Sequence, residues 1–147
     1  MRPMGLFSVL FQQLTSRIGS YNFSRAALPL LLKSKSLSPS PTLLFTGATG
    51  SLRGGALFSA FASSKFALRA LAQSLAREFG PQGVHVSHII IDAVIDTPGT
   101  AAWKVGNGEK DSKISPESIA ESYWYLHNQP KDSWTHELDL RPYQEKF

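Results

Sequence analysis

Apolar residues along the chain follow two different periods, and each period predicts one kind of element. Residues 43–46 form a short, mostly apolar run that is typical of a buried strand. Residues 58–79 place leucines and phenylalanines at three- and four-residue spacing, with polar residues between them, which predicts an amphipathic helix. Gly80 and Pro81 end that helix, and residues 84–91 then form a β-branched run typical of an interior parallel strand.

The last part of the chain adds one more helix and one more strand. Ser115 is suited to cap a helix, Pro116 to occupy its first position, and Glu117 to interact with the helix dipole in the first turn. Residues 134–140 alternate between apolar and polar side chains like a final strand. The order strand, helix, strand, helix, strand predicts an α/β fold with a parallel sheet.

The length of 147 residues suits a single domain with a buried core. We divide this domain into a helix over residues 1–33, a loop over 34–41, a strand–helix–strand core over 42–99, and a C-terminal helix and strand over 100–147. No apolar run is long enough to span a membrane, so no membrane partner is expected. The acid-free amino terminus also has the composition of a mitochondrial transit peptide, but we favour a cytoplasmic location.

Charge is distributed unevenly along the chain, whose formal net charge is +4. Residues 1–77 carry nine Lys or Arg and no Asp or Glu, whereas residues 78–147 carry eleven acids and six bases. A basic half can attract nucleic acid or an import machinery. We favour the interpretation that these basic side chains lie on solvated helix faces, because no basic cluster is denser than Lys33-Ser34-Lys35. Nucleic acid is therefore not an expected partner.

Two kinds of chemistry are not supported by the residue types. The chain has no cysteine, which excludes disulfides and thiolate metal sites. His85 and His88 lie three positions apart in a predicted strand, so their side chains point to opposite faces, and no metal site is predicted. No Ser-His-Asp arrangement is evident either, because none of the four histidines lies in a catalytic motif.

A glycine-rich turn, TGATGSLRGG, follows the first strand and precedes the long helix. Strand, glycine turn and helix is the arrangement with which α/β folds bind nucleotides. However, the spacing of Gly47, Gly50 and Gly54 does not match the G-x-G-x-x-G of a dinucleotide-binding loop. The first acidic residue after the turn is Glu78, which lies in a helix and not at the end of the next strand. This turn therefore fails the context expected of a pyrophosphate site.

The sequence instead resembles the C-terminal half of a short-chain dehydrogenase/reductase. The resemblance rests on the LRGG turn, the Ser64-Lys65 step, the alanine-rich helix with LAREF, the GPQGVHV segment and the closing DTP, and it covers about residues 16–147. It implies a partial Rossmann-like, doubly wound fold whose parallel sheet retains the equivalents of strands 5, 6 and 7 with flanking helices. It also implies a truncated domain, because the family's cofactor-binding first half is missing from the matched order.

The resemblance implies an active site on the long helix. The family uses Tyr-x-x-x-Lys there, where the lysine lowers the pKa of the tyrosine and holds the nicotinamide ribose while the tyrosine transfers the proton. This chain retains Lys65 but has Phe61 at the tyrosine position. Ala48 stands at the position of the substrate-orienting serine, and Ser16 at the position of the helix asparagine. Catalysis by the family mechanism is therefore expected to be impaired.

The implied cofactor is NAD or NADP. Lys65 would contact its ribose and Thr97 its carboxamide, and Asp92 with Ala93 replaces the family's Pro-Gly beside the cofactor. Because the pyrophosphate turn belongs to the missing half, full-strength cofactor binding is not expected. The sequence identifies neither the small-molecule substrate nor the choice between the two cofactors.

Three functional hypotheses follow. The first is an NAD(P)-dependent oxidoreductase of an alcohol or a carbonyl, and the second is a non-catalytic homologue that pairs with full-length relatives. The third is an import or nucleic-acid role for the basic half. The helix over residues 58–79, with its leucines and alanines, is a candidate surface for homo-oligomers or hetero-association. Residues 43–46 should form an unprotected sheet edge, without the charges that usually blunt one, so the isolated domain should be only marginally stable.

Overall fold

The computed structural model describes residues 18–108 and 111–145, and it confirms the predicted α/β fold with a parallel sheet. Apart from three short 3₁₀ turns, its described elements are α2 (Ser20–Lys33), β1 (Thr42–Ala48), α3 (Ser59–Phe79), β2 (His85–Ile91), α4 (Pro116–His127) and β3 (Glu137–Leu140).

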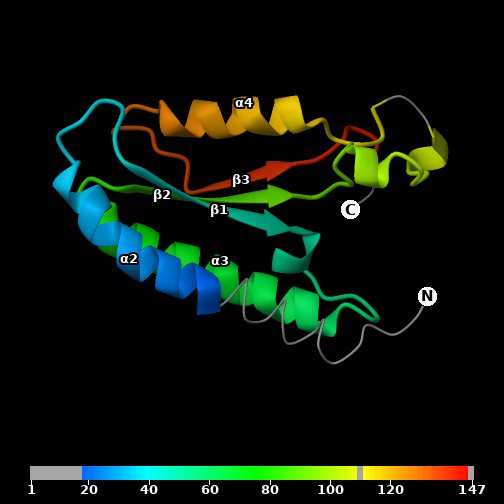
Figure 1. Ribbon diagram of the computed structural model, residues 1–147, viewed down its shortest axis with the longest axis horizontal. Helices are drawn as coiled ribbons and strands as arrows, with labels where there is room; N and C mark the ends of the chain where they lie inside the picture. The colour runs from blue at the N-terminus through cyan, green and yellow to red at the C-terminus, as the bar shows by residue number, and fades with distance from the viewer. Residues whose placement is uncertain (1–17, 109–110, 146–147) are drawn as a thin grey trace.

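The three strands lie in the order β1-β2-β3, and both pairings are parallel. Figure 1 shows three layers, with α4 on one face of the sheet and α2 and α3 on the other. Every residue of the central strand β2 is buried, as expected for a strand covered on both faces. The carboxyl ends of the strands meet at one edge of the sheet, where the glycine turn leaves β1.

Each face of the sheet has its own apolar core. The core beneath α2 and α3 is built from Leu28, Leu43, Phe45, Leu68, Ala72, Leu75, Val84 and Val86. The core beneath α4 is built from Ile89, Ile91 and Leu126, with Leu44, Tyr123 and Leu138 among the residues packed around it. Alternate residues of β1 and β2 contribute to opposite cores, which is the two-residue period of a strand.

Most predicted element bounds agree with the structure to within one residue, and two strands differ by more. The last part of the helix predicted over residues 1–33 is α2, and residues 1–17 lie outside the described residues. The first strand is longer than the apolar run and extends to Ala48. The last strand is shorter than predicted and begins only at Glu137, because the residues before it bond elsewhere: the Thr135 N–H donates to the Gln129 side chain at 2.9 Å, and the Trp134 ring stacks on His85. The start of α4 is as predicted, since the Ser115 hydroxyl accepts the Ser118 N–H.

The apolar stripe of α3 covers the sheet. Leu68, Ala72 and Leu75 are buried in the core beneath the helix, so they are not available as a surface for another chain. The outer side of the helix exposes Phe66 instead, at 43% of its surface. Self-association through this helix stays a prediction, and it would have to use that outer side.

Strand β1 forms one edge of the described sheet, as predicted. The expectation that this edge is unprotected by charge is wrong at one point, because the Lys65 ammonium donates to the Thr46 carbonyl at 2.8 Å. Sequence alone does not show that a lysine on the following helix reaches back to the strand. None of the described helices is long and apolar enough to cross a membrane.

Candidate functional site

The predicted catalytic positions gather at the carboxyl end of β1. Ala48 ends the strand, a 3₁₀ turn over Thr49–Ser51 follows, and α3 begins at Ser59. Phe61 and Lys65 lie one helical turn apart near the start of α3 and share a face of the helix. The fold thus brings together three of the four catalytic positions expected from the sequence, whereas Ser16 lies outside the described residues.

Phe61 fills the position where the family resemblance places a tyrosine. Its ring packs so closely against Gly50 that a Cβ atom added there would lie 2.8 Å from the nearest ring carbon. The hydroxyls of the two serines before Lys65 do not replace the missing phenol: Ser64 donates to the Phe61 carbonyl at 2.8 Å and Ser63 to the Ala60 carbonyl at 3.1 Å. Both hydroxyls are bound to the backbone of their own helix.

Lys65 is held between the helix and the strand edge. Its Nζ donates to the Thr46 carbonyl and lies 5.8 Å from the centre of the Phe61 ring. Burial lowers the pKa of this ammonium group, because a low-dielectric environment disfavours the charged form. With a phenyl ring beside it and not a phenol, the lysine has no tyrosine pKa to lower.

Asp92 is buried at the end of β2 and is bonded on both sides. One carboxylate oxygen accepts the Thr49 hydroxyl, and the other lies 2.9 Å from a guanidinium nitrogen of Arg141, just beyond β3. This chain of contacts links the carboxyl ends of all three strands. The predicted cofactor contact at Asp92 therefore has a second explanation, which is that the carboxylate joins the strand ends.

Thr97 lies in the loop after β2 and caps a short 3₁₀ turn. Its hydroxyl lies 3.1 Å from the Thr100 hydroxyl, which in turn donates to the Ile95 carbonyl. The hydrogen bonds of Thr97 are thus local to its loop, and none of those found joins it to Lys65 or Phe61. Among the described residues, no group of three His, Cys, Asp or Glu side chains lies close enough together to hold a metal ion.

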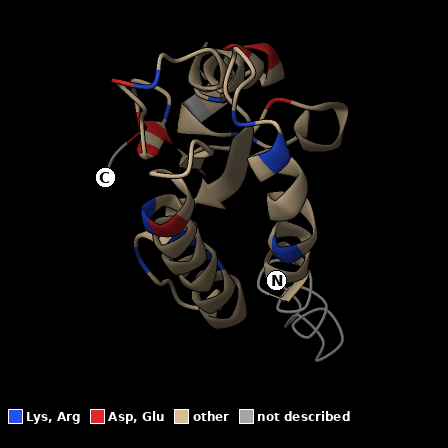
Figure 2. Cartoon of the chain, turned by 90° about the vertical axis from the view of Figure 1, so that its left-hand side faces the viewer, with Lys and Arg blue, Asp and Glu red and all other residues tan. Residues whose placement is uncertain are grey.

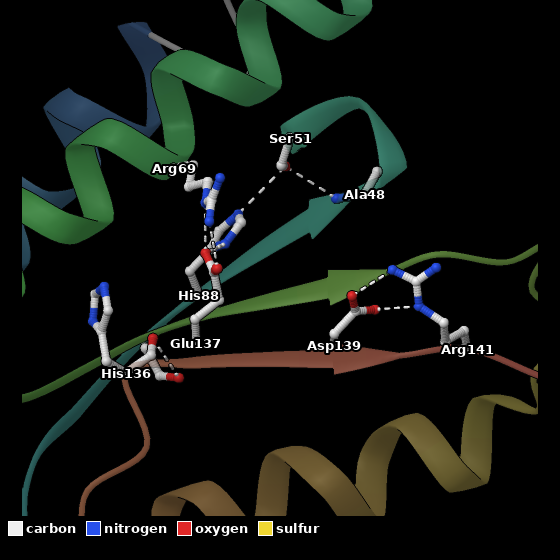
Figure 3. A network of polar contacts seen from close by, with 9 residues as sticks. Ala48, Ser51, Arg69, His88, His136, Glu137, Asp139 and Arg141 are labelled. Carbon is white, nitrogen blue, oxygen red and sulfur yellow. Dashed lines mark hydrogen bonds and ion pairs between the residues drawn. The ribbon is translucent and has the colours of Figure 1, made fainter. Parts of the chain in front are cut away.

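The structure also contains a polar network that the sequence did not indicate. The Arg69 guanidinium donates two hydrogen bonds of 2.7 Å to the Glu137 carboxylate, and His88 Nδ1 donates to the same carboxylate at 2.9 Å (Figure 3). His88 Nε2 then accepts the Ser51 hydroxyl at 3.4 Å, and the Ser51 oxygen accepts the Ala48 N–H at 3.2 Å. A chain of contacts therefore runs from α3 through β3 and β2 to the turn after β1.

Serine, histidine and carboxylate follow one another in this network as in a nucleophilic triad. The side chains of Ser51 and His88 are 0% exposed, however, so no substrate carbonyl reaches the serine oxygen. The same oxygen already accepts the Ala48 N–H, which fixes the turn. The network is accordingly structural, and it holds the glycine turn against the sheet.

The network predicts a loss of stability in mild acid. Burial lowers the pKa of His88 below the ordinary 6.5, and the hydrogen bonds from Arg69 lower the pKa of Glu137 below 4.5. The unfolded chain therefore takes up protons that the folded chain resists, first as the pH falls below 6.5 and again below 4.5. The urea midpoint should be constant above pH 7 and decrease in these two steps.

Urea unfolding of the His88→Gln variant provides the control for that prediction. Burial also lowers the pKa of His85, so the variant should reduce the first step without removing it. A urea midpoint of the wild-type chain that rises as the pH falls from 7 to 6 would contradict the assignment of the first step to buried histidines with a lowered pKa.

Comparison with known proteins agrees with this geometry. A sequence profile described as short chain dehydrogenase matches residues 14–107. The chain is similar to an uncharacterized oxidoreductase of Staphylococcus aureus (strain N315), with 28% identity over 124 residues that make up 84% of this chain and 50% of the relative.

Two solved structures are similar to the whole arrangement. A short-chain dehydrogenase from Rhodopseudomonas palustris has 38% sequence identity and a TM-score of 0.69, over 92% of this chain and 52% of that one. An alcohol dehydrogenase from the archaeon Thermococcus sibiricus, complexed with 5-hydroxy-NADP, has 23% identity and a TM-score of 0.76, over 97% and 57% of the two chains. The chain thus spans about half the length of the oxidoreductases that it matches.

Proposed function

Because the chain belongs to the short-chain dehydrogenase family, we propose that it is a member in which NAD(P)-dependent oxidoreduction of an alcohol or a carbonyl is lost or strongly impaired. The observation that carries this proposal is the phenyl ring of Phe61, packed against Gly50 and one helical turn before Lys65. A phenyl ring has no proton to give to or take from a substrate oxygen. Ala48 likewise has no hydroxyl with which to orient one.

The described residues also fit a dinucleotide poorly. The Lys65 ammonium that would contact a ribose is bonded to the Thr46 carbonyl, and the Asp92 carboxylate is bonded to Thr49 and Arg141. In the glycine turn, the Ala48 N–H donates to the Ser51 side chain, and the Leu52 and Arg53 N–H groups donate to the Thr49 carbonyl, so these N–H groups do not form an open cradle for a phosphate. We therefore propose no reaction step through NAD or NADP in this chain.

Steady-state assays with NAD or NADP and a panel of alcohols test the proposal. Turnover should be at least about 10²–10⁴-fold below that of a working enzyme, which is the usual cost of losing a general acid. The double variant Phe61→Tyr with Ala48→Ser should not restore activity, because the described residues still offer no pyrophosphate site. Several turnovers per second by purified, wild-type chain would contradict the proposal.

A second candidate function is association with another protein of the same family. Large apolar side chains are exposed on α2, α3 and α4, and apolar surface of this kind is available to a partner. They include Phe23 at 63%, Phe66 at 43% and Trp124 at 68% of their surfaces. Sedimentation of the chain with the full-length Rhodopseudomonas palustris relative should then give a complex with the summed mass. Two unchanged, separate species at micromolar concentration would count against association.

A further inference from the structure

We propose that a groove at the amino ends of β2 and β3 is a binding site for a small aromatic carboxylate. The groove lies at the opposite end of the strands from Phe61 and Lys65, so this inference does not depend on the function proposed above. The amino ends of the strands face the viewer in Figure 2.

The groove has the size and lining of a small-molecule site. Its volume is about 350 Å³, and its walls include Ala76 and Arg77 near the end of α3, Val86 of β2, and Trp134 and His136 before β3. Ligand pockets of this size combine mostly apolar walls with a few polar groups. Arg77 and His136 can supply charge and hydrogen bonds, whereas Ala76, Val86 and Trp134 offer an apolar surface.

His136 has hydrogen-bonding capacity that nothing in the described structure uses. Both of its ring nitrogens are buried, and neither has a hydrogen-bond partner among residues 18–108 and 111–145. Figure 3 shows the ring on the same side of the sheet as Arg69 of α3, which is the side of the groove. Because no hydrogen bond holds the ring, it can turn about its Cβ–Cγ bond and present a nitrogen to the groove. A buried polar group without a partner costs free energy, so a ligand that supplies the partner is favoured.

Arg77 supplies a positive charge beside the groove. Its Nη1 donates to the Gln73 carbonyl of the same helix at 2.9 Å, and no carboxylate of the described residues pairs with it. The neighbouring Glu78 does not face it, since consecutive helical residues point to different sides. Glu137, the acid next to His136, is already bonded within the polar network described above. A guanidinium can bind a carboxylate through two parallel hydrogen bonds, which favours a carboxylate over a neutral ligand.

The wall residue Trp134 is held in one orientation before any ligand binds. Its ring stacks on the buried His85 ring, with 4.9 Å between the ring centres and 5° between the planes. Its indole N–H also donates to the Gln129 carbonyl at 3.3 Å. A wall that is already fixed loses little conformational freedom when a ligand packs against it. A flat aromatic body therefore suits this groove better than a flexible chain of the same size.

A titration of the full chain followed by NMR tests the proposal. The probe is benzoate, and the matched control is benzamide, which has nearly the same shape and no charge. Benzoate should shift the Trp134 indole and His136 amide signals in a saturable way, and benzamide should bind about tenfold more weakly or less, because a charge-assisted hydrogen bond is lost. The dissociation constant of benzoate should be about 10 mM or lower, which is the value for nine non-hydrogen atoms at the low end of ligand efficiency.

Two results of this titration would overturn the proposal. The first is the absence of a saturable shift with benzoate in that concentration range. The second is equally tight binding of acetate or inorganic phosphate, which would show a general anion site without selection for an aromatic body.

Three variants separate the groove from the general positive charge of the chain. Arg77→Gln and His136→Phe should each weaken benzoate binding by about tenfold, since each removes a hydrogen-bond donor to the carboxylate. Arg25→Gln is the matched control and should leave binding unchanged. It removes the same charge from α2, on which Figure 2 shows only Lys and Arg and no acid.

The stability of His136→Phe distinguishes a binding role from a structural one. If the ring nitrogens have no partner in the ligand-free chain, the variant should have a urea midpoint equal to or higher than that of the wild type. A lower midpoint would show that the nitrogens are already satisfied, for example by a buried water, and would overturn the proposal. The exposed Arg77 serves if His136→Phe does not fold: a folded Arg77→Gln chain that binds benzoate as tightly as the wild type would also overturn it.

Discussion

Replacement of Gly47 with alanine should lower the free energy of unfolding by about 2–3 kcal/mol, as overpacking of a buried site does. A Cβ atom at this position would lie 2.4 Å from Nε2 of His88 and 2.9 Å from the hydroxyl oxygen of Ser51. Neither group can move away easily, because both are fully buried and His88 is also bonded to Glu137. The glycine is thus required by space and not by an unusual backbone conformation.

Urea denaturation of four variants checks this result: Gly47→Ala, Gly54→Ala, His88→Ala and the double variant of Gly47→Ala with His88→Ala. Gly54→Ala is the matched control, since nothing lies within 4 Å of its added Cβ and the same change of residue type should be neutral or slightly stabilising. In a His88→Ala background, Gly47→Ala should cost much less than in the wild type, because the clashing ring is gone. Equal costs of Gly47→Ala in both backgrounds would show that His88 is not the obstacle.

Replacement of Glu137 with alanine should cost roughly 3 kcal/mol of stability. The change removes both acceptors of the Arg69 guanidinium and the acceptor of His88 Nδ1, which lies in a fully buried ring. Leaving a buried donor without an acceptor costs more than the hydrogen bond itself contributes. The carboxylate is 25% exposed, so water will reduce the penalty below that of a fully buried ion pair.

Asp139→Ala provides a comparison within the same strand. Asp139 pairs with Arg141 at the surface, and an exposed pair of this kind contributes at most about 1 kcal/mol. The double variant Arg69→Leu with Glu137→Leu should be more stable than Glu137→Ala, because it leaves no unpaired guanidinium. If thermal melts show that Glu137→Ala and Asp139→Ala lose equal stability, the prediction that the buried network depends on Glu137 is contradicted.

The local elements of the fold could be predicted because their signals are local. The leucine spacing of α3 and the Ser115-Pro116-Glu117 start of α4 depend on neighbouring residues, and the structure confirms both. The bounds of the last strand could not be predicted in the same way. The Gln129 side chain bonds to Thr135 and the strand begins only at Glu137, and such a bond depends on how the preceding turn folds.

In the candidate site, too, features with a local sequence signal could be predicted and features that depend on distant residues could not. Phe61 and Ala48 are visible as substitutions in a sequence pattern, because the motif has fixed spacing along one helix and one turn. His88 is bonded to Glu137 of β3 and Asp92 to Arg141 just beyond it, and the register that places His88 beside Glu137 is set by tertiary packing. Two adjacent parallel strands carry no sequence signal of their register, so the polar network could not be found before the structure.

The network of Arg69, His88 and Glu137 has a consequence for the order in which the chain folds. Its bonds join residues 68 and 49 positions apart, which makes them late events in a folding chain. During synthesis, β1, α3 and β2 leave the ribosome well before residue 137 and can associate first. The His88 imidazole, which supports the glycine turn, therefore has no carboxylate partner until Glu137 has been synthesised. β3 therefore joins after β1, α3 and β2, and only its addition fixes a turn that was made much earlier.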